Sequence, residues 1–197
     1  LKFVMKNLKP GCTEYQAQAD FEYKIFHEGA DGTAFPTIAG SGANGTMLHY
    51  DTNRDVCEDE TLLLMDLGAK FQGYCADITR TYPVNGKYNG PSETGLRRCS
   101  GSKPRRCKSS KTGYDIKRAR RYRKGCSRRG LCETWLIEKK EDVGTYYMHG
   151  VSHHLGIDVH DVTAAWNDKL RPGAIITDEP GLYIDEWEIG IRIEMIS

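Results

Sequence analysis

The pattern of hydrophobic and polar positions predicts one helix near the N-terminus and several strands after it. Ala17, Phe21 and Ile25 recur at helical spacing behind Thr13, which can cap a helix, so residues 13–28 are expected to be helical. A helix followed by strands that short turns connect favours an α+β fold with a mostly antiparallel sheet. The predicted strands are residues 46–50, 61–69, 73–82, 174–179 and 188–196.

The composition is that of an ordinary globular domain. The chain has 197 residues, of which 39% are hydrophobic and 28% are charged, enough for a substantial core. It contains no run of about 18 apolar residues, so no membrane span is expected. The seven cysteines are odd in number and lack CxxC spacing, which disfavours a disulfide framework and favours reduced thiols in a cytoplasmic protein.

Two acidic residues, Asp66 and Asp77, interrupt neighbouring hydrophobic strands. If Phe71 and Gln72 form the tip of a tight hairpin, Asp66 lies opposite Asp77, with Cβ atoms about 5 Å apart. Two buried carboxylates at that distance repel each other, and must share a proton or bind a cation. Either side chain could instead point to solvent, although the hydrophobic run at residues 62–64 favours a buried strand.

Histidines cluster in the second half of the chain. Four of the six lie within twelve residues: His149, His153, His154 and His160. Gly150 and Gly156 argue against a regular helix here, so this is not a helical HExxH zinc motif. Neutral imidazole is a common metal ligand, but the spacing alone leaves a structural role equally open.

Two more acidic residues lie near the C-terminal end. Glu179 precedes a Pro-Gly break, and Glu194 ends a predicted strand in which Arg192 alternates onto the same face. Taken alone, Arg192 and Glu194 could form an ordinary surface ion pair.

Together these segments resemble the Xaa-Pro aminopeptidases and prolidases of the pita-bread metallopeptidase family. The segments, in family order, are LHY, DLGAKFQGYCADITRTYPVNGK, HGVSHHLGIDVHD, EPGLYI and GIRIE. The resemblance covers residues 1–94 and 134–194, and implies a pita-bread fold with a curved, mostly antiparallel sheet flanked by helices. It also implies that residues 1–197 are a catalytic domain, incomplete at its C-terminus and without the usual N-terminal domain.

The resemblance implies a site for two divalent metal ions. Its ligands would be Asp66, Asp77, His153, Glu179 and Glu194. Four carboxylates balance two such cations, with a bridging hydroxide as the one extra charge. A ligand set rich in oxygen, with a single imidazole, favours manganese.

Catalytic roles also follow from the resemblance. Glu179 would carry the proton of the attacking water. His149 and His160 would line the substrate site and stabilise the oxyanion, and His49 would line the site too. Arg192 would orient the acidic ligands. The resemblance assigns no role to His154.

The implied reaction is hydrolysis of the peptide bond between an N-terminal residue and a following proline, by a hydroxide that bridges two metals. The alternatives are a dipeptidase of the prolidase type, or a non-catalytic relative with a basic nucleic-acid-binding segment. The expected partner is a peptide with proline in second position. A membrane is not expected as a partner, nucleic acid is disfavoured, and a homo-oligomer stays open.

Charge is divided sharply along the chain. Residues 95–132 contain 15 of the 28 Lys and Arg residues and only one of the 27 acidic residues, Asp115. The family has two amphipathic helices of mixed charge here, so residues 95–133 are interpreted as an aberrant basic segment that reads as no helix. A shifted reading frame would explain a normal length with altered composition. The alternative is a genuine basic arm whose Tyr114 and Tyr122 could stack on bases.

Overall fold

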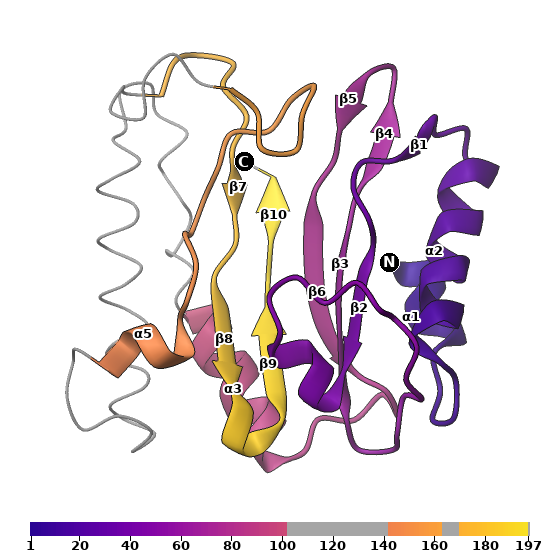
Figure 1. Ribbon diagram of the computed structural model, residues 1–197, viewed down its shortest axis with the longest axis vertical. Coiled ribbons are helices and arrows are strands. Elements are labelled where there is room, and N and C mark those ends of the chain that lie inside the picture. The colour runs from indigo at the N-terminus through magenta and orange to yellow at the C-terminus, as the bar shows by residue number, and fades with distance from the viewer. Residues whose placement is uncertain (102–141, 163–169, 197) are drawn as a thin grey trace.

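In a computed structural model, the chain is described over residues 1–101, 142–162 and 170–196, and combines helices with short antiparallel strands (Figure 1). The helical elements are α1 (Lys2–Asn7), α2 (Glu14–His27), the 3-10 helix η1 (Gly42–Thr46), α3 (Gly90–Gly101), α5 (Val143–Tyr146) and the 3-10 helix η4 (Asp185–Trp187). The strands are β1 (Gly32–Thr33), β2 (Ile38–Ser41), β3 (Leu62–Leu67), β4 (Ala69–Phe71), β5 (Tyr74–Cys75), β6 (Ile78–Pro83), β7 (Thr177–Asp178), β8 (Gly181–Ile184), β9 (Ile189–Arg192) and β10 (Met195–Ile196). The predicted α+β class is confirmed.

Antiparallel pairing organises all of the described strands. Strand β3 lies between β2 and β6, β4 lies between β1 and β5, and β8–β9 and β7–β10 form two further pairs. Helices α1 and α2 lie together along one side of the molecule, and α3 packs against β8 and β9 (Figure 1).

The predicted helix at residues 13–28 is confirmed as α2. Thr13 is its N-cap, and Gln16 closes a capping box by accepting a hydrogen bond from the Thr13 backbone N–H (2.9 Å). Ala17 and Phe21 turn inward and are buried in the core. Helix α1, which sequence periodicity did not predict, adds the buried Val4 to the same core.

Strand β3 is buried on both faces, as its continuous hydrophobic sequence predicted. Leu63, Met65 and Leu67 join the core under α1 and α2. Leu62 and Leu64 alternate onto the other face, where they belong to two smaller hydrophobic clusters. Asp66 lies on the same face of β3 as Leu62 and Leu64. This second face therefore carries both hydrophobic core residues and one of the predicted metal ligands.

The predicted register of the central hairpin is wrong by two residues. Gln72 and Gly73 have φ values of +49° and +83° and form the two-residue turn, whereas Phe71 pairs with Tyr74 below them. As a result Asp66 lies opposite Thr79, and Asp77 precedes β6. Because side-chain direction repeats every two residues, this shift leaves Asp66 and Asp77 on the same face as diagonal neighbours.

Two further expectations need correction. Residues 46–50 do not form a strand, because the segment that begins with η1 turns around the buried Glu14, to which Asn44 donates a hydrogen bond (3.0 Å). Residues 95–101 of the basic segment are helical, as the second half of α3, and bury Cys99 against Ile191. The remainder of the basic segment lies outside the described residues.

The C-terminal strand prediction at residues 188–196 is confirmed in outline as β9 and β10, and residues 174–179 contain β7. Strand β8, directly after the Pro-Gly break, was not predicted. Among the described residues, no helix combines the length and apolar character needed to cross a membrane.

Candidate functional site

The five residues predicted as metal ligands lie on adjacent backbone segments. Strand β7 and its flanking residues bond to residues 151–155 on one side and to β10 on the other. Next, the Glu194 N–H donates to the Thr79 carbonyl (3.0 Å), and β6 pairs with β3. Each segment carries one candidate ligand on it or directly beside it. Across the segments they follow the order His153, Glu179, Glu194, Asp77, Asp66.

His153 occupies the centre of this group. Its Nδ1 hydrogen-bonds to the His154 carbonyl oxygen (3.0 Å) and therefore carries a proton, so Nε2 is the nitrogen that faces the acids. Nε2 lies 3.4 Å from Asp77 Oδ2, 3.7 Å from Glu179 Oε1 and 3.9 Å from Glu194 Oε1. A histidine fixed by a carbonyl at one nitrogen, with the other facing acidic side chains, has the arrangement of a metal ligand.

The pKa of His153 reflects these neighbours. Burial alone would lower it, but the contact with Asp77, the His154 carbonyl and the charge of Glu179 raise the pKa to about 9. Without a metal ion, the His153 ring therefore carries protons on both nitrogens at neutral pH and is a cation at the point where the carboxylates converge.

Three carboxylate oxygens of the site are buried without a hydrogen-bond partner: Asp66 Oδ1, Asp77 Oδ1 and Glu194 Oε1. An unsatisfied buried acceptor is costly unless something else binds it. Asp77, His153 and Glu194 each offer one ligand atom, and these atoms lie within 4.8 Å of one another. Oxygen donors with one imidazole are a ligand set that suits manganese and similar divalent ions. The residues present therefore fit a divalent metal.

Crowding perturbs the acids themselves. Burial raises the pKa of Glu179 to about 7. Burial, followed by the charges of Asp66, Asp77 and Glu179, raises the pKa of Glu194 to about 9. The pKa of Asp77 is also raised by burial and by Asp66, although His153 partly opposes this. Burial is the largest cause of each shift, because it disfavours the charged form of a carboxylate.

Arg192 supplies part of that positive charge and is only 4% exposed. Its guanidinium donates to Asp66 Oδ2 (2.6 Å), to Thr79 Oγ1 (3.0 Å) and to the Tyr183 hydroxyl (2.8 Å). Thr79 in turn donates to Glu194 Oε2 (2.7 Å). Burial would lower the pKa of Arg192, but Tyr183 and Asp66 outweigh it and raise the pKa. Arg192 thus fixes the orientation of two of the candidate ligands.

A chain of hydrogen bonds runs from Arg192 to His149. The Tyr183 hydroxyl accepts from Arg192 and can donate its own proton to His149 Nε2 (2.8 Å). His149 Nδ1 hydrogen-bonds to the Gly150 carbonyl and lies 3.6 Å from Glu179 Oε2, so Nδ1 carries the proton. Burial, reinforced by the charge of Arg192, lowers the pKa of His149 to about 4. His149 is therefore a neutral imidazole of defined tautomer.

The other predicted histidines lie around this centre. The His160 ring meets the His153 ring edge-on, with centroids 4.4 Å apart. Exposed His49 lies close enough to lower the pKa of both His149 and His160 electrostatically. His154 pairs through its backbone with Ile176. Residues 148–161 contain no helix, so the expectation of a non-helical histidine segment is confirmed.

Sequence reasoning missed two residues that support the site. Tyr183 links Arg192 to His149, and Thr177 accepts a hydrogen bond from the His153 backbone N–H (3.1 Å) through its hydroxyl. Tyr183 lies on the unpredicted strand β8, whose Leu182 and Ile184 point instead into a hydrophobic cluster. Alternation within Gly-Leu-Tyr-Ile was the one available signal.

Residues 1–196 match the family model of metallopeptidase family M24. The chain belongs to this family. It is 34% identical over 227 aligned residues to the Xaa-Pro aminopeptidase of Escherichia coli (strain K12), an alignment that covers 97% of this chain and 47% of that protein. It is 33% identical over 187 residues to the mitochondrial intermediate cleaving peptidase 55 of Arabidopsis thaliana, covering 90% of this chain and 38% of that protein.

A solved structure agrees with the family assignment. Zinc-substituted Escherichia coli aminopeptidase P in complex with product superposes with a TM-score of 0.90 at 32% identity, covering 98% of this chain and 48% of that chain. The M24 domain therefore has the pita-bread fold that the sequence predicted. The chain spans half or less of the length of these relatives. Since one relative is named as mitochondrial, the expected cytoplasmic location stays a prediction.

Proposed function

We propose that this M24 domain hydrolyses the peptide bond between an N-terminal residue and a following proline. The observation that carries the proposal is the convergence of Asp77, His153 and Glu194 within 4.8 Å, beside Glu179, in a chain 34% identical to an Xaa-Pro aminopeptidase. The substrate class comes from that relative. The cluster of acids and imidazole independently supports metal-dependent hydrolysis.

In this proposal two divalent ions, manganese by preference, are held by Asp66, Asp77, His153, Glu179 and Glu194. When bound, such ions lower the pKa of a water molecule and polarise the scissile carbonyl. The partnerless oxygens of three of these carboxylates support the assignment, because each is buried and lacks a donor.

Glu179 is proposed to carry the proton between the attacking water and the leaving amine. In the protein without metal, burial raises its pKa to about 7, so this carboxyl both accepts and releases a proton more readily near neutral pH than an exposed glutamate does. Glu179 Oε1 lies 3.7 Å from His153 Nε2, and Glu179 Oε2 lies 3.6 Å from His149 Nδ1. A proton on the Glu179 carboxyl is therefore held between two histidines of the site.

His149 is proposed to stabilise the oxyanion that forms on the substrate carbonyl. The hydrogen bond from Tyr183 to Nε2 keeps the proton of the neutral ring on Nδ1. Nδ1 donates to the Gly150 carbonyl in this structure, and in this proposal it shares that proton with the oxyanion when substrate binds. Arg192 holds Tyr183 in place, so the orientation of His149 does not depend on the substrate. His160 and His49 are proposed to line the entrance on the side of His153 and His149.

A peptidase assay with a metal-binding measurement tests the proposal. With added manganese, the chain should release the first residue of a tripeptide that has proline second, and much less from the matching tripeptide with alanine second. Glu179→Gln should reduce turnover by about 10²–10⁴-fold or more, because it removes the proton carrier and a ligand charge. Glu188→Gln is the matched control, since Glu188 is exposed in the turn between β8 and β9.

Three outcomes would change the conclusion. Cleavage of the Xaa-Pro dipeptide but not the tripeptide would indicate a prolidase-type dipeptidase. Equal cleavage of the proline and alanine peptides would refute the specificity. Calorimetry that finds no manganese binding, or the same binding in Asp77→Asn, would refute the metal site whether or not the chain is active.

A further inference from the structure

Two cysteines, Cys12 and Cys57, meet where the chain enters helix α2. Residues 9–12 form a tight turn in which the Cys12 N–H donates to the Lys9 carbonyl (3.1 Å). Pro10 and Gly11 occupy the central positions of this turn, and Gly11 has a φ of +85°, as the second central position of a type II turn requires.

The turn continues into a bulged antiparallel pairing. The Gly11 N–H donates to the Cys57 carbonyl (3.0 Å), and the Cys57 N–H donates to the Cys12 carbonyl (2.7 Å). Thr13 pairs with Val56 in the next position. Gly11 and Cys12 together therefore oppose Cys57, the geometry of a bulge with glycine in its first position. Opposed residues in antiparallel pairs have Cα atoms about 4.5–5.5 Å apart, within the range of about 4.4–6.8 Å that a disulfide spans.

The two thiols are neighbours at the same hydrophobic core but have different surroundings. Both cysteines are free. Cys57 is fully buried in the core that contains Leu63 and Tyr82. Burial, and then the adjacent Cys12 thiol, raise the pKa of Cys57 to about 12, so the Cys57 side chain stays protonated.

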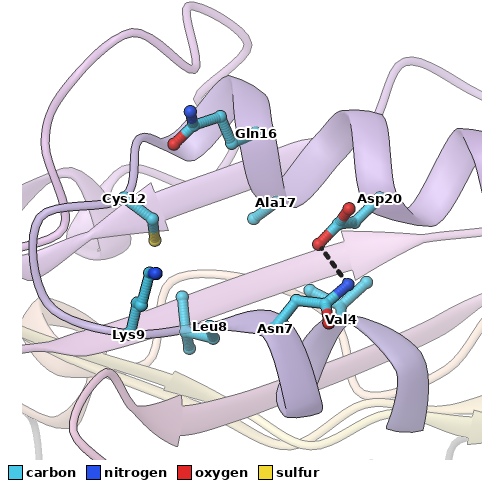
Figure 2. A pocket seen from close by; sticks show the side chains of 8 residues that line it. All are labelled: Val4, Asn7, Leu8, Lys9, Cys12, Gln16, Ala17 and Asp20. Atoms are coloured by element: carbon cyan, nitrogen blue, oxygen red, sulfur yellow. Dashed lines mark hydrogen bonds between the residues drawn. The ribbon is translucent and has the colours of Figure 1, made fainter.

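Cys12 is half-buried and lines a cavity of about 290 Å³ between α1 and α2. Figure 2 shows its sulfur directed into the space that Leu8, Lys9 and Ala17 also line. A small oxidant that enters this cavity reaches Cys12 first, whereas Cys57 lies behind it.

We propose that Cys12 and Cys57 form an oxidation site, in which a hydroperoxide oxidises Cys12 and Cys57 then closes a disulfide bond. In the first step the Cys12 thiol attacks one peroxide oxygen, the O–O bond breaks, and Cys12 becomes a sulfenic acid as one water is released. In the second step the Cys57 sulfur attacks the sulfenic sulfur, and the expelled hydroxyl takes the Cys57 proton to form a second water. Two thiols are oxidised by two electrons, and one hydrogen peroxide is reduced to two waters.

The site is separate from the acidic centre. Cys12 and Cys57 lie in and beside the core beneath α1 and α2, and neither contributes to the network of Arg192, Tyr183 and His149. The proposal thus does not depend on peptidase activity.

Peptide mapping of the whole chain tests the proposal. The reduced protein is treated with equimolar hydrogen peroxide, unfolded in denaturant that contains an alkylating agent to block free thiols, and digested with trypsin. Because trypsin does not cleave before Pro10, Cys12 lies in the peptide of residues 7–24, and Cys57 lies in that of residues 55–70. We expect a cross-linked pair of these two peptides, lighter by two hydrogens than their sum, that dithiothreitol separates.

Variants distinguish the roles of the two thiols. Cys57→Ser should leave Cys12 as a sulfenic acid that dimedone traps, and Cys12→Ser should leave Cys57 unoxidised. Cys75→Ser is the matched control, since Cys75 is also half-buried but bonds to the Ile157 carbonyl, and it should not alter the cross-link. Closing so long a loop should also raise the melting temperature of the oxidised protein by about 5–10 °C.

The wild-type map decides the question even if a variant does not fold. The proposal is overturned if peroxide converts Cys12 to sulfinic acid while Cys57 remains alkylatable. It is also overturned if the peptide of residues 7–24 is found joined to a cysteine other than Cys57.

Discussion

Glu14, the first residue of α2, is a buried carboxylate outside the candidate site, and its replacement by glutamine gives a strong test of the structure. The side chain is 0% exposed. Oε1 accepts hydrogen bonds from the Ser41 N–H (2.7 Å) and Asn44 Nδ2 (3.0 Å). Oε2 accepts from the Tyr50 hydroxyl (2.7 Å) and the Asp55 N–H (3.0 Å). The carboxylate therefore joins α2 to β2, η1 and the segment that carries His49.

Glu14→Gln preserves the shape of the side chain but replaces one acceptor oxygen by an NH₂ group. In either amide orientation, two of the four donors then face another donor. The Tyr50 hydroxyl can rotate away, but the N–H groups of Ser41 and Asp55 are fixed by the backbone. Each buried group left unsatisfied costs about 1–3 kcal/mol, so we expect a loss of about 2–5 kcal/mol in the free energy of unfolding. That is a large share of the roughly 5–15 kcal/mol that a domain typically has.

Urea unfolding followed by circular dichroism measures this loss, with equal m-values showing that the folded state is otherwise unchanged. Glu28→Gln is the matched control, because it makes the same chemical change at the other end of α2. The Glu28 side chain is 63% exposed and pairs with Lys24, so solvent screens the pair and its loss should barely change the free energy of unfolding. A Glu14→Gln variant as stable as Glu28→Gln would refute the view that this carboxylate organises the fold around it.

Three further predictions concern the acidic centre. Arg192→Met should lower the free energy of unfolding by about 3–5 kcal/mol, because it leaves Asp66 buried without its cation, and Arg192→Lys should lose less; urea unfolding of both variants checks this. In EDTA, the free energy of unfolding should fall by up to about 2.7 kcal/mol per pH unit between pH 7 and 9, about 1.4 from each of His153 and Glu194, because the pKa values of both are raised to about 9 in the folded state and their stabilisation, complete below the unfolded values, is lost as pH rises; unfolding across this range should show no such slope with saturating manganese. Manganese should raise the melting temperature of the wild type but not of Asp77→Asn, and an equal rise in both would exclude Asp77 as a ligand.

Sequence patterns predicted a helix or strand accurately where a capping residue and regular apolar spacing define its ends and its buried face. Thr13 capped α2 and the apolar spacing defined its buried face, so that helix was predicted within a residue at each end. The hairpin register failed because nothing in the sequence required Gln72 to adopt a positive φ. Helix α3 was missed although Asn89 and Ser92 exchange capping hydrogen bonds at its start (2.9 and 3.0 Å), because the basic composition beyond Gly95 obscured that signal.

The candidate site could be anticipated from the sequence further than the fold details could. Every predicted ligand is an aspartate, glutamate or histidine, residue types that can bind a metal. An error of two residues in the register leaves Asp66 and Asp77 on the same face of the sheet. Tyr183 could not be found in this way, since a tyrosine in a hydrophobic strand is ordinarily a core residue. Its role depends on Arg192, which becomes its neighbour when β8 and β9 pair, and on His149, which comes from a third segment of the chain.

The positions of the protons in the acidic centre indicate how the site is balanced. His153 Nε2 faces three carboxylates at 3.4–3.9 Å, and this crowding raises the pKa of His153 itself, while burial and neighbouring charges raise that of Glu194. Arg192 bonds directly to Asp66 and reaches Glu194 through Thr79, so its direct hydrogen bonds do not extend to the acids around His153. Protons therefore remain as the counterions of that half of the site in the protein alone. A divalent ion that binds there must displace them, so metal affinity should rise with pH over the same range in which the metal-free fold loses stability.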